Sequence, residues 1–224
     1  MTATPGSSNT TTPGTSNTAT PGTSGTTTPG TSRTGTPGSD ETSVSSEVLS
    51  GDALATRYTA DGAVIEQLVR PARAIELELE PHPEGGWYRR TWTSDVTVDV
   101  VAPDGSVRTR PTATLILFLL PPGEFSAWHR VTSAETWIWN GLAPVTLELG
   151  GTGDSPSDVT SHVLGADTPA GEEVQVTIAA NTWQRTLPTS SDVLASCVVS
   201  PGFDFADFSL DEPVKPASAQ QTSA

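Results

Sequence analysis

Residues 119–141 read LLPPGEFSAWHRVTSAETWIWNG, and this stretch decides the fold. An apolar run ends at the turn signal Pro121-Pro122-Gly123, and a lone His129 follows it. Successive side chains of an extended chain point to opposite faces, so Ala127, His129 and Val131 share one face. The histidine therefore lies among small apolar groups, as expected for a residue inside a β-barrel.

By the same alternation, Glu135, Trp137 and Trp139 share a face, which places a carboxylate at the end of an aromatic wall. If this face and the face of His129 both point into a barrel, they line an apolar cavity that contains one carboxylate and one imidazole. That composition is typical of a small-molecule site. The alternative is that the tryptophans are ordinary core residues and Glu135 lies at the rim, and the sequence leaves both interpretations open.

The chain around this stretch has the pattern of many short strands. After Gly86, segments rich in β-branched and aromatic residues alternate with turn signals such as PDGS, PPG and GGTGDSPSD. The strand segments are WYRRTW, VTVDVV, TATLILFLL, PVTLELG, VQVTI and VLASCVVS. No helical pattern lies between them, so we expect an all-β antiparallel sandwich or barrel, and 224 residues suit one such domain.

The region before these strands predicts a short helical segment. In VIEQLV at 64–69, apolar residues follow the i, i+3, i+4 spacing of a helix. Pro71 interrupts the pattern, and a second short helix is expected from there to Leu79, because proline is tolerated in the first turn of a helix.

Charge and composition restrict the partners. Asp and Glu outnumber Lys and Arg by 26 to 11, which gives a formal net charge of −15. This excess repels phosphate backbones and anionic membrane surfaces, so we expect neither nucleic acid nor a membrane as a partner. No apolar run approaches the roughly 18 residues of a membrane span, and the N-terminus lacks the pattern of a secretory signal. These two features predict a cytoplasmic protein.

An octapeptide beginning with TPG occurs five times from Thr4, as TPGSSNTT, TPGTSNTA, TPGTSGTT, TPGTSRTG and TPGSDETS. The repeats carry no aliphatic residue larger than alanine, so burial cannot offset the entropy cost of ordering them. We therefore expect residues 1–43 to be disordered and 44–61 to be a linker. The folded domain is expected over 62–212, and a disordered C-terminal tail over 213–224.

Four separated segments resemble, in order and spacing, the HPEGG-marked branch of the cupin superfamily. They are PHPEGGWYRRTW at 81–92, PPGEFSAWHRVTSAETW at 121–137, GEEVQVTIAANTWQ at 171–184 and SCVVSPGFDFADF at 196–208. The resemblance implies a cupin jelly-roll barrel, a homodimer, and a shape related to that of sugar-nucleotide epimerases. It implies no assigned activity, because a fold does not specify a function.

Metal-binding cupins carry two histidines and a glutamate in a first motif and a third histidine in a later segment. Here His129 and Glu135 fit the first motif, but Val131 stands in the place of its second histidine, and Gln184 stands where the later histidine would be. Asn181, at a glycine position of the later segment, is compatible with a left-handed backbone. One imidazole and one carboxylate are a thin ligand set for a transition metal, so we expect no metal and no other cofactor.

His129 and Glu135 are the predicted catalytic pair, because a carboxylate can orient an imidazole and stabilise the imidazolium formed on proton uptake. The predicted ligand-binding side chains around them are Glu84, Tyr88, Arg89, Trp137, Trp139 and Gln184. Arg89 would hold an anionic group, and Tyr88 is a possible acid. The sequence does not decide whether Tyr88 or Trp87 faces inward.

Three functions remain open, and whether the chain is an enzyme is open with them. The first is a small-molecule-binding cupin without an assigned reaction, whose ligand is held inside the apolar barrel. The second is an epimerase or isomerase of a sugar or sugar nucleotide that uses His129 as general base. The third, a metal-dependent oxygenase, is disfavoured by the absent histidines. His82 could supply a further imidazole to the site, but the sequence HPEGG is more typical of a turn that leads into a strand.

Deletion of residues 1–43 is expected to leave the thermal midpoint of unfolding nearly unchanged, because the repeats offer no large apolar groups to a core. Calorimetry of the full-length and truncated chains measures this difference. A drop of several degrees on truncation would show that the repeats pack against the domain.

Overall fold

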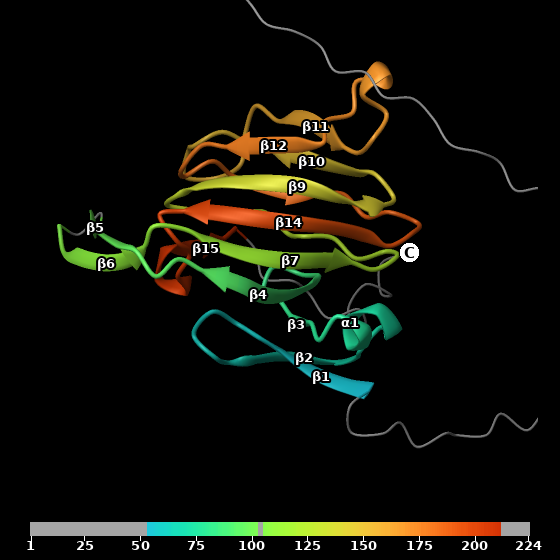
Figure 1. Cartoon of the computed structure of the whole chain (residues 1–224), viewed down its shortest axis with the longest axis horizontal. Helices are drawn as coiled ribbons and strands as arrows, with labels where there is room; N and C mark the ends of the chain where they lie inside the picture. Colours follow the sequence, from blue (N-terminus) through green and yellow to red (C-terminus); the bar gives the residue numbers. More distant parts are fainter. Residues whose placement is uncertain (1–52, 103–104, 212–224) are drawn as a thin grey trace, which may run out of the picture. The chain divides into compact units, whose positions relative to one another are not determined.

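The structure is a computed structural model, and it describes residues 53–102 and 105–211 (Figure 1). The predicted disordered tails, 1–43 and 213–224, lie outside the described residues. Within them the predicted all-β architecture is confirmed, and each of the six strand segments singled out in the sequence contributes a strand.

The described residues contain fifteen strands, one α-helix and two short 3₁₀ turns. The first elements are β1 (Leu54–Tyr58), β2 (Val64–Val69), α1 (Ala72–Glu76), β3 (Glu80–Pro81), β4 (Trp87–Thr93), β5 (Thr97–Val101), β6 (Val107–Pro111) and β7 (Thr114–Leu120). They are followed by β8 (His129–Val131), β9 (Ala134–Leu142), β10 (Val145–Leu149), β11 (Thr160–Leu164), η2 (Thr168–Ala170), β12 (Gln175–Ile178), β13 (Gln184–Thr186), β14 (Val193–Ser200), η3 (Phe205–Asp207) and β15 (Phe208–Leu210).

Two antiparallel sheets form the barrel. One has the strand order β12-β9-β14-β7-β4-β3 and the other the order β11-β10-β13-β8-β15. Side chains of both sheets meet in one core, in which Phe118 of β7 and Trp137 of β9 pack with Leu147 of β10 and Leu164 of β11. The jumps in strand order between chain neighbours are those of a jelly roll rather than of a meander.

The six-stranded sheet is also covered on its outer side. Trp87 of β4 and Leu119 of β7 point outward and pack against Ala55 of β1, Ala74 of α1 and Leu79. Because β7 is covered on both sides, its sequence TLILFLL is a continuous apolar run rather than an alternating one.

The predicted helix over 64–69 is wrong, because this segment is strand β2, paired with β1. The two strands are joined through Asp61-Gly62, where Gly62 has a φ of +89°. Asp-Gly between strand-forming residues is a hairpin signal, and cross-strand pairing outweighs a helical spacing that extends over so few residues. The end of the predicted linker is wrong as well, since β1 lies within it. The second helix is confirmed as α1, inside the predicted range.

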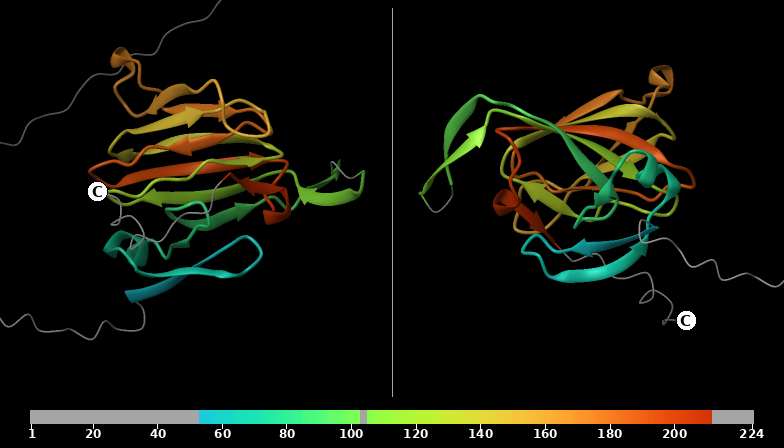
Figure 2. Two further views of the ribbon diagram at one scale, coloured as in Figure 1. Left: turned by 180° about the vertical axis from the view of Figure 1, so that it is seen from behind. Right: turned by 60° about the horizontal axis from the view of Figure 1, so that its bottom comes forward.

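Strands β5 and β6 form a separate two-stranded ribbon that projects from the barrel (Figure 2). Ion pairs join this ribbon to the C-terminal segment, because Arg110 of β6 lies 3.5 Å from Asp204 and 2.9 Å from Asp207. The ribbon therefore helps to fix the segment that closes one end of the barrel.

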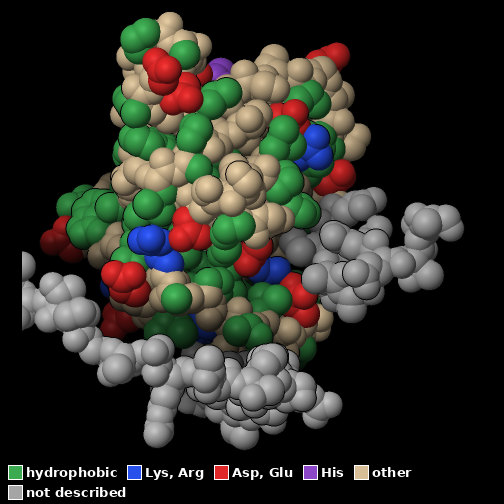
Figure 3. All heavy atoms as spheres, turned by 90° about the vertical axis from the view of Figure 1, so that its right-hand side faces the viewer, with side chains coloured by type: hydrophobic (Ala, Val, Ile, Leu, Met, Phe, Trp, Pro, Cys, Tyr) green, Lys and Arg blue, Asp and Glu red, His purple; other side chains and the backbone are tan. Residues whose placement is uncertain are grey.

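Carboxylates and a few arginines lie scattered among apolar and uncharged side chains on the face in Figure 3. The described residues of that face show no continuous basic patch, so the acidic excess of the sequence is not offset there. No helix in the described ranges is long and apolar enough to span a membrane.

Arg57 of β1 is buried in an ionic network. Its guanidinium lies 2.7 Å from Glu66 of β2 and 3.2 Å from Glu124. Glu124 also accepts hydrogen bonds from the backbone N–H of Gly86, at 3.2 Å, and from the indole N–H of Trp87, at 2.9 Å. The network anchors the β1–β2 hairpin to the segment that enters β4.

Arg57→Met is expected to lower the free energy of unfolding by about 2–4 kcal/mol, because it leaves the largely buried carboxylate of Glu66 without a cation. Arg73→Met is the control, since Arg73 and Asp192 form a more exposed ion pair, worth no more than about 1 kcal/mol. Urea denaturation measures both variants. Equal losses would contradict the anchoring role of Arg57.

Candidate functional site

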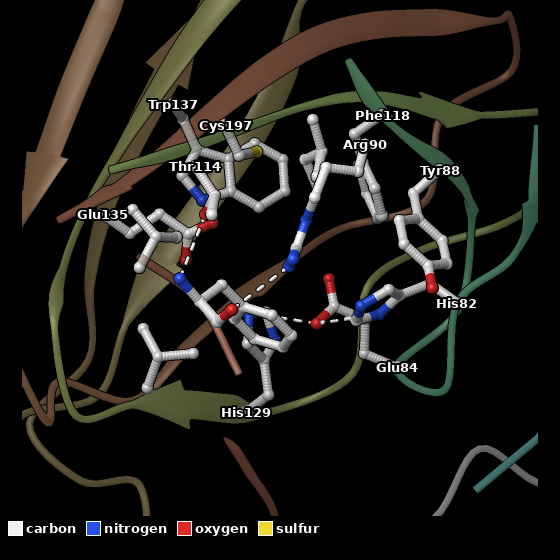
Figure 4. Close-up of a pocket in the computed structure, with 14 residues that line it drawn as sticks. His82, Glu84, Tyr88, Arg90, Thr114, Phe118, His129, Glu135, Trp137 and Cys197 are labelled. Carbon is white, nitrogen blue, oxygen red and sulfur yellow. Dashed lines mark hydrogen bonds and ion pairs between the residues drawn. The ribbon is translucent and has the colours of Figure 1, made fainter. Parts of the chain in front are cut away.

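One cavity inside the barrel collects the buried polar side chains of the interior (Figure 4). Its walls are apolar side chains of β7, β9 and β14, and its charged or titratable groups are His82, Glu84, Tyr88, Arg90, His129, Glu135 and Cys197. The cavity volume is about 30 Å³. The side chains therefore converge closely around a small space.

The turn at 82–86 requires glycine at two positions. Gly85 and Gly86 have φ values of +109° and +67°, in the region that favours glycine. A Cβ at Gly85 would overlap the carbonyl oxygen of Phe125, and a Cβ at Gly86 would lie 2.8 Å from the ring of Phe118. The two glycines thus allow the turn to pack tightly against the barrel wall.

Two hydrogen bonds fix this turn beside strand β8. The backbone N–H of His82 donates to the carbonyl of Gly86 at 3.0 Å, and the carbonyl of Glu84 accepts from the backbone N–H of Ala127 at 2.7 Å. His82 and Glu84 are therefore held next to the segment that carries His129.

The carboxylate of Glu84 lies between two imidazoles. Its Oε2 is 3.3 Å from Nδ1 of His82 and 3.3 Å from Nε2 of His129, and all three side chains are buried. Burial alone would raise the pKa of Glu84, but the charges of His129 and His82 and a hydrogen bond from Ser126 outweigh it and hold the pKa below its usual value. Glu84 is therefore an anion at neutral pH.

The second nitrogen of His129 defines its role. Nδ1 lies 2.8 Å from the carbonyl oxygen of Ala127, and because a carbonyl only accepts, this nitrogen carries a proton. The nitrogen that takes up or releases a proton is then Nε2, which lies 3.3 Å from Glu84, so the two groups attract each other when Nε2 is protonated. Burial lowers the pKa of His129, and the charge of Glu84 offsets this only in part. The ring is therefore a buried proton acceptor whose carboxylate partner is Glu84.

Glu135 lies in the same cavity but is bound to a different partner. The indole N–H of Trp137 donates to Oε1 of Gln184 at 2.9 Å, which orients the amide so that its Nε2 donates to Oε2 of Glu135 at 2.6 Å. Burial, followed by the negative charge of Glu84, raises the pKa of Glu135 to about 8. At pH 7 it is mostly a neutral acid. The predicted direct pairing of His129 with Glu135 is thus wrong, because each has its own partner.

Strand β4 turns Tyr88 and Arg90 into the cavity and Trp87 and Arg89 to the other side. This decides the question that the sequence left open, and it corrects the prediction of Arg89 as the ligand-binding arginine. Arg89 is exposed, and its Nε donates to the carbonyl of Leu77 at 3.0 Å. Burial raises the pKa of the Tyr88 phenol.

Trp139 does not line the cavity, which corrects another predicted ligand contact. It shares the face of Trp137 but lies further along β9, where it packs against the core and donates its indole N–H to the carbonyl of Ala143 at 3.1 Å. Cys197 of β14 does line the cavity, beside Glu135. Burial raises the pKa of its thiol well above the usual value, which disfavours the nucleophilic thiolate.

Three phenylalanines of the C-terminal segment cover the histidines. The rings of Phe203, Phe205 and Phe208 lie 6.4, 5.8 and 5.7 Å from the ring of His82, measured between centroids, and Phe208 lies 5.7 Å from His129. This aromatic layer covers both imidazoles, and one of its rings, Phe203, also lines the cavity.

A family described as Cupin superfamily (DUF985) matches residues 73–211. The chain is a member of the cupin superfamily. Hairpin β1–β2, which carries Arg57, lies before the matched range.

Two solved structures are similar to this cupin. A hypothetical protein from Leishmania major is 30% identical, with a TM-score of 0.53 over 61% of this chain and 83% of that one. Protein SO0799 from Shewanella oneidensis is 32% identical, with a TM-score of 0.53 over 64% of this chain and 85% of that one. No curated protein matches the chain. The family and these relatives support a cupin-domain protein of unknown function.

The side chains of this cupin do not fit the ligand set described above for metal-binding cupins. Val131 offers no ligand atom, and the amide oxygen of Gln184 is already bound by Trp137. In the described part of the chain, no group of three or more His, Cys, Asp or Glu side chains is arranged to hold a metal ion. Asn181, whose residue type was judged compatible with a left-handed backbone, has such a backbone, with a φ of +63°.

Three residues at the cavity were not predicted as site residues: His82, which was assigned to a turn, and Arg90 and Phe203, which were not singled out. His82 stands two residues before Glu84 in a turn, where no strand alternation guides the choice. Arg90 follows from alternation once Tyr88 is known to face inward. Phe203 lies in the last of the four segments that resemble the family, but nothing in the spacing places it over the barrel.

Glu135→Gln is expected to flatten the pH dependence of stability between about pH 5 and 8. An unfolded chain loses this proton near pH 4.5, whereas folded Glu135 keeps it to about pH 8. The native state then binds more protons than the unfolded state, so the free energy of unfolding of the wild type falls as the pH rises through this interval. Glutamine has no such proton to lose.

Urea denaturation at pH 5, 7 and 9 measures this effect. The stability of the variant relative to the wild type should increase with pH. Parallel pH profiles for the two proteins would contradict the raised pKa.

Proposed function

We propose that this cupin binds a small organic molecule in the barrel cavity, with Glu84, His129 and Glu135 as its polar contacts. The observation that supports this proposal is the concentration of perturbed titratable groups around one small space. A protein that buries charged groups is less stable than one that buries apolar residues of the same volume. Such groups gather in a single cavity where they serve a ligand.

A second candidate is an isomerase or epimerase, favoured by the contrast between the two carboxyl groups. Nε2 of His129 would remove a proton next to a carbonyl, and the anion Glu84 would stabilise the imidazolium that forms. A neutral acid, Glu135 or the phenol of Tyr88, would return a proton to the substrate. Two carboxyl groups whose environments drive their pKa values apart are the pattern expected of an acid and a base.

We also propose that the chain belongs to the HPEGG-marked, epimerase-like branch of the cupins. This is supported by the part that the HPEGG turn plays in holding His82 and Glu84. A homodimer and a cytoplasmic location accompany that proposal. The homodimer rests on the resemblance of the sequence, and the location rests on its composition.

His129→Asn is expected to reduce at least tenfold the amount of a small molecule that co-purifies with the wild type, because it removes the basic nitrogen from the cavity. Untargeted mass spectrometry of molecules released on denaturation measures this amount. His162→Asn is the matched control, since His162 lies outside the cavity and pairs with Glu173 at 2.7 Å. The same small-molecule profile in all three proteins, an empty one included, would contradict a ligand in the cavity.

Deuterium exchange then separates the two candidates. Uptake of solvent deuterium into the released compound, lost in His129→Asn, indicates an isomerase. Binding without exchange indicates a protein that holds its ligand unchanged.

A further inference from the structure

The polar groups around the cavity are distributed unevenly, and their distribution points to one kind of ligand. We infer that the cavity takes a short oxo acid, whose carboxylate lies against Arg90 at the mouth and whose carbonyl oxygen accepts a hydrogen bond from Glu135 further in. This inference rests on the proposed function and adds to it a substrate class.

Arg90 supplies the positive end. Its side chain extends from β4 into the cavity (Figure 4) and donates one hydrogen bond, at 3.2 Å, to the carbonyl of Phe203. Its guanidinium carbon lies 5.9 Å from the centre of the Phe203 ring. Within residues 53–102 and 105–211 no carboxylate forms an ion pair with Arg90, whereas Arg57 has two carboxylate partners.

A guanidinium has five N–H donors in a planar fork, and a carboxylate matches two of them at once. With one donor used by a carbonyl, Arg90 keeps enough donors to bind an anionic group of a ligand. The exposed position of Arg90 lets such a group enter from solvent.

Glu135 supplies a hydrogen-bond donor at the other end. Its Oε2 accepts from Gln184, so the proton of the neutral acid is left on Oε1. The groups that face it are Glu84 across the cavity and Cys197 from β14. Because Glu84 is an anion, it would repel a charged acceptor placed next to it. A neutral carbonyl is therefore the complementary group that a ligand would present to Glu135.

Glu84 does not occupy the position of an anionic ligand at Arg90. Its carboxylate lies between His82 and His129, 3.3 Å from a nitrogen of each, and forms no ion pair with Arg90. Ile116 and Val199 on the cavity wall suit a short carbon skeleton between the two polar ends.

The size of the cavity restricts the choice further. The cavity volume is only about 30 Å³. A molecule of a few heavy atoms fits this space after small side-chain shifts, whereas a sugar nucleotide would require the walls to move apart. A short acid is therefore favoured over the sugar nucleotide that the sequence left open.

Calorimetric titration of the purified full-length protein tests the inference with matched probes. Pyruvate and levulinate carry both a carboxylate and a carbonyl, at two spacings. Propionate and pentanoate lack the carbonyl, and the methyl esters of the two oxo acids lack the charge. At least one oxo acid is expected to bind the wild type at least tenfold more tightly than its matched acid and its matched ester.

Two arginine variants place the carboxylate. Arg90→Gln is expected to weaken binding of the oxo acid at least tenfold. Arg89→Gln, which changes the neighbour on the outer side of β4, should leave that affinity unchanged.

The pH dependence of oxo-acid affinity tests whether the carbonyl binds to Glu135. Affinity in the wild type should fall above pH 8, where Glu135 ionises, but should persist in Glu135→Gln, whose amide still donates.

Equal affinity for oxo acid and ester, full binding by Arg90→Gln, or failure of both oxo acids to bind would overturn the inference. Identification of the compound released from the purified protein distinguishes failure of this inference from failure of the proposed function. If that compound is neutral and depends on His129, the cavity binds a ligand of another class, and only the oxo acid is excluded. If the cavity holds neither that compound nor a probe, both proposals fail.

Discussion

The carboxylate of Glu84 is the interaction on which the candidate site depends. One oxygen lies 3.3 Å from a nitrogen of His82 and 3.3 Å from a nitrogen of His129, inside a barrel closed by aromatic rings. The two imidazoles keep Glu84 ionised, and the resulting negative charge adds to burial in keeping Glu135 protonated. The cavity therefore contains a carboxylate and a carboxylic acid at the same pH, which gives it both an acceptor and a donor.

The fold holds this arrangement from outside the barrel as well as from within it. Gly85 and Gly86 allow the turn to lie against the wall, and Glu124 accepts a hydrogen bond from the backbone N–H of Gly86. Glu124 is in turn paired with Arg57, in a hairpin that precedes the range matched by the family. Asp207 links the aromatic layer to Arg110 of the projecting ribbon. Both attachments are ionic, so changes in charge at these distant positions are expected to affect the order of the site.

Strand alternation accounts for what the sequence could predict. It placed His129 and Glu135 on inward faces and predicted the all-β barrel, because one side of each strand is buried. It failed at the start of β4, where Trp87 is buried on the outer side of the sheet and Tyr88 lines the cavity on the inner side. Composition could not tell which of the two faces inward, and Arg89 was chosen instead of Arg90. The resemblance to the cupins gave the fold but no partner for each polar group, and the pairing of His129 with Glu84 depends on tertiary packing of a turn. The helix expected at 64–69 failed for a related reason, since pairing with β1 is not visible in the spacing of that segment alone.

Titration of the Glu135 carboxyl carbon by NMR, with 13C-labelled glutamate, tests the central claim most directly when the wild type is compared with Glu84→Gln. If the charge of Glu84 helps to keep Glu135 protonated, the wild type titrates near pH 8 and the variant titrates at a lower pH. Burial should still keep the midpoint of the variant above the ordinary value for glutamate. The same midpoint in both proteins, or a midpoint near 4.5 in the wild type, would contradict the electrostatic coupling across the cavity.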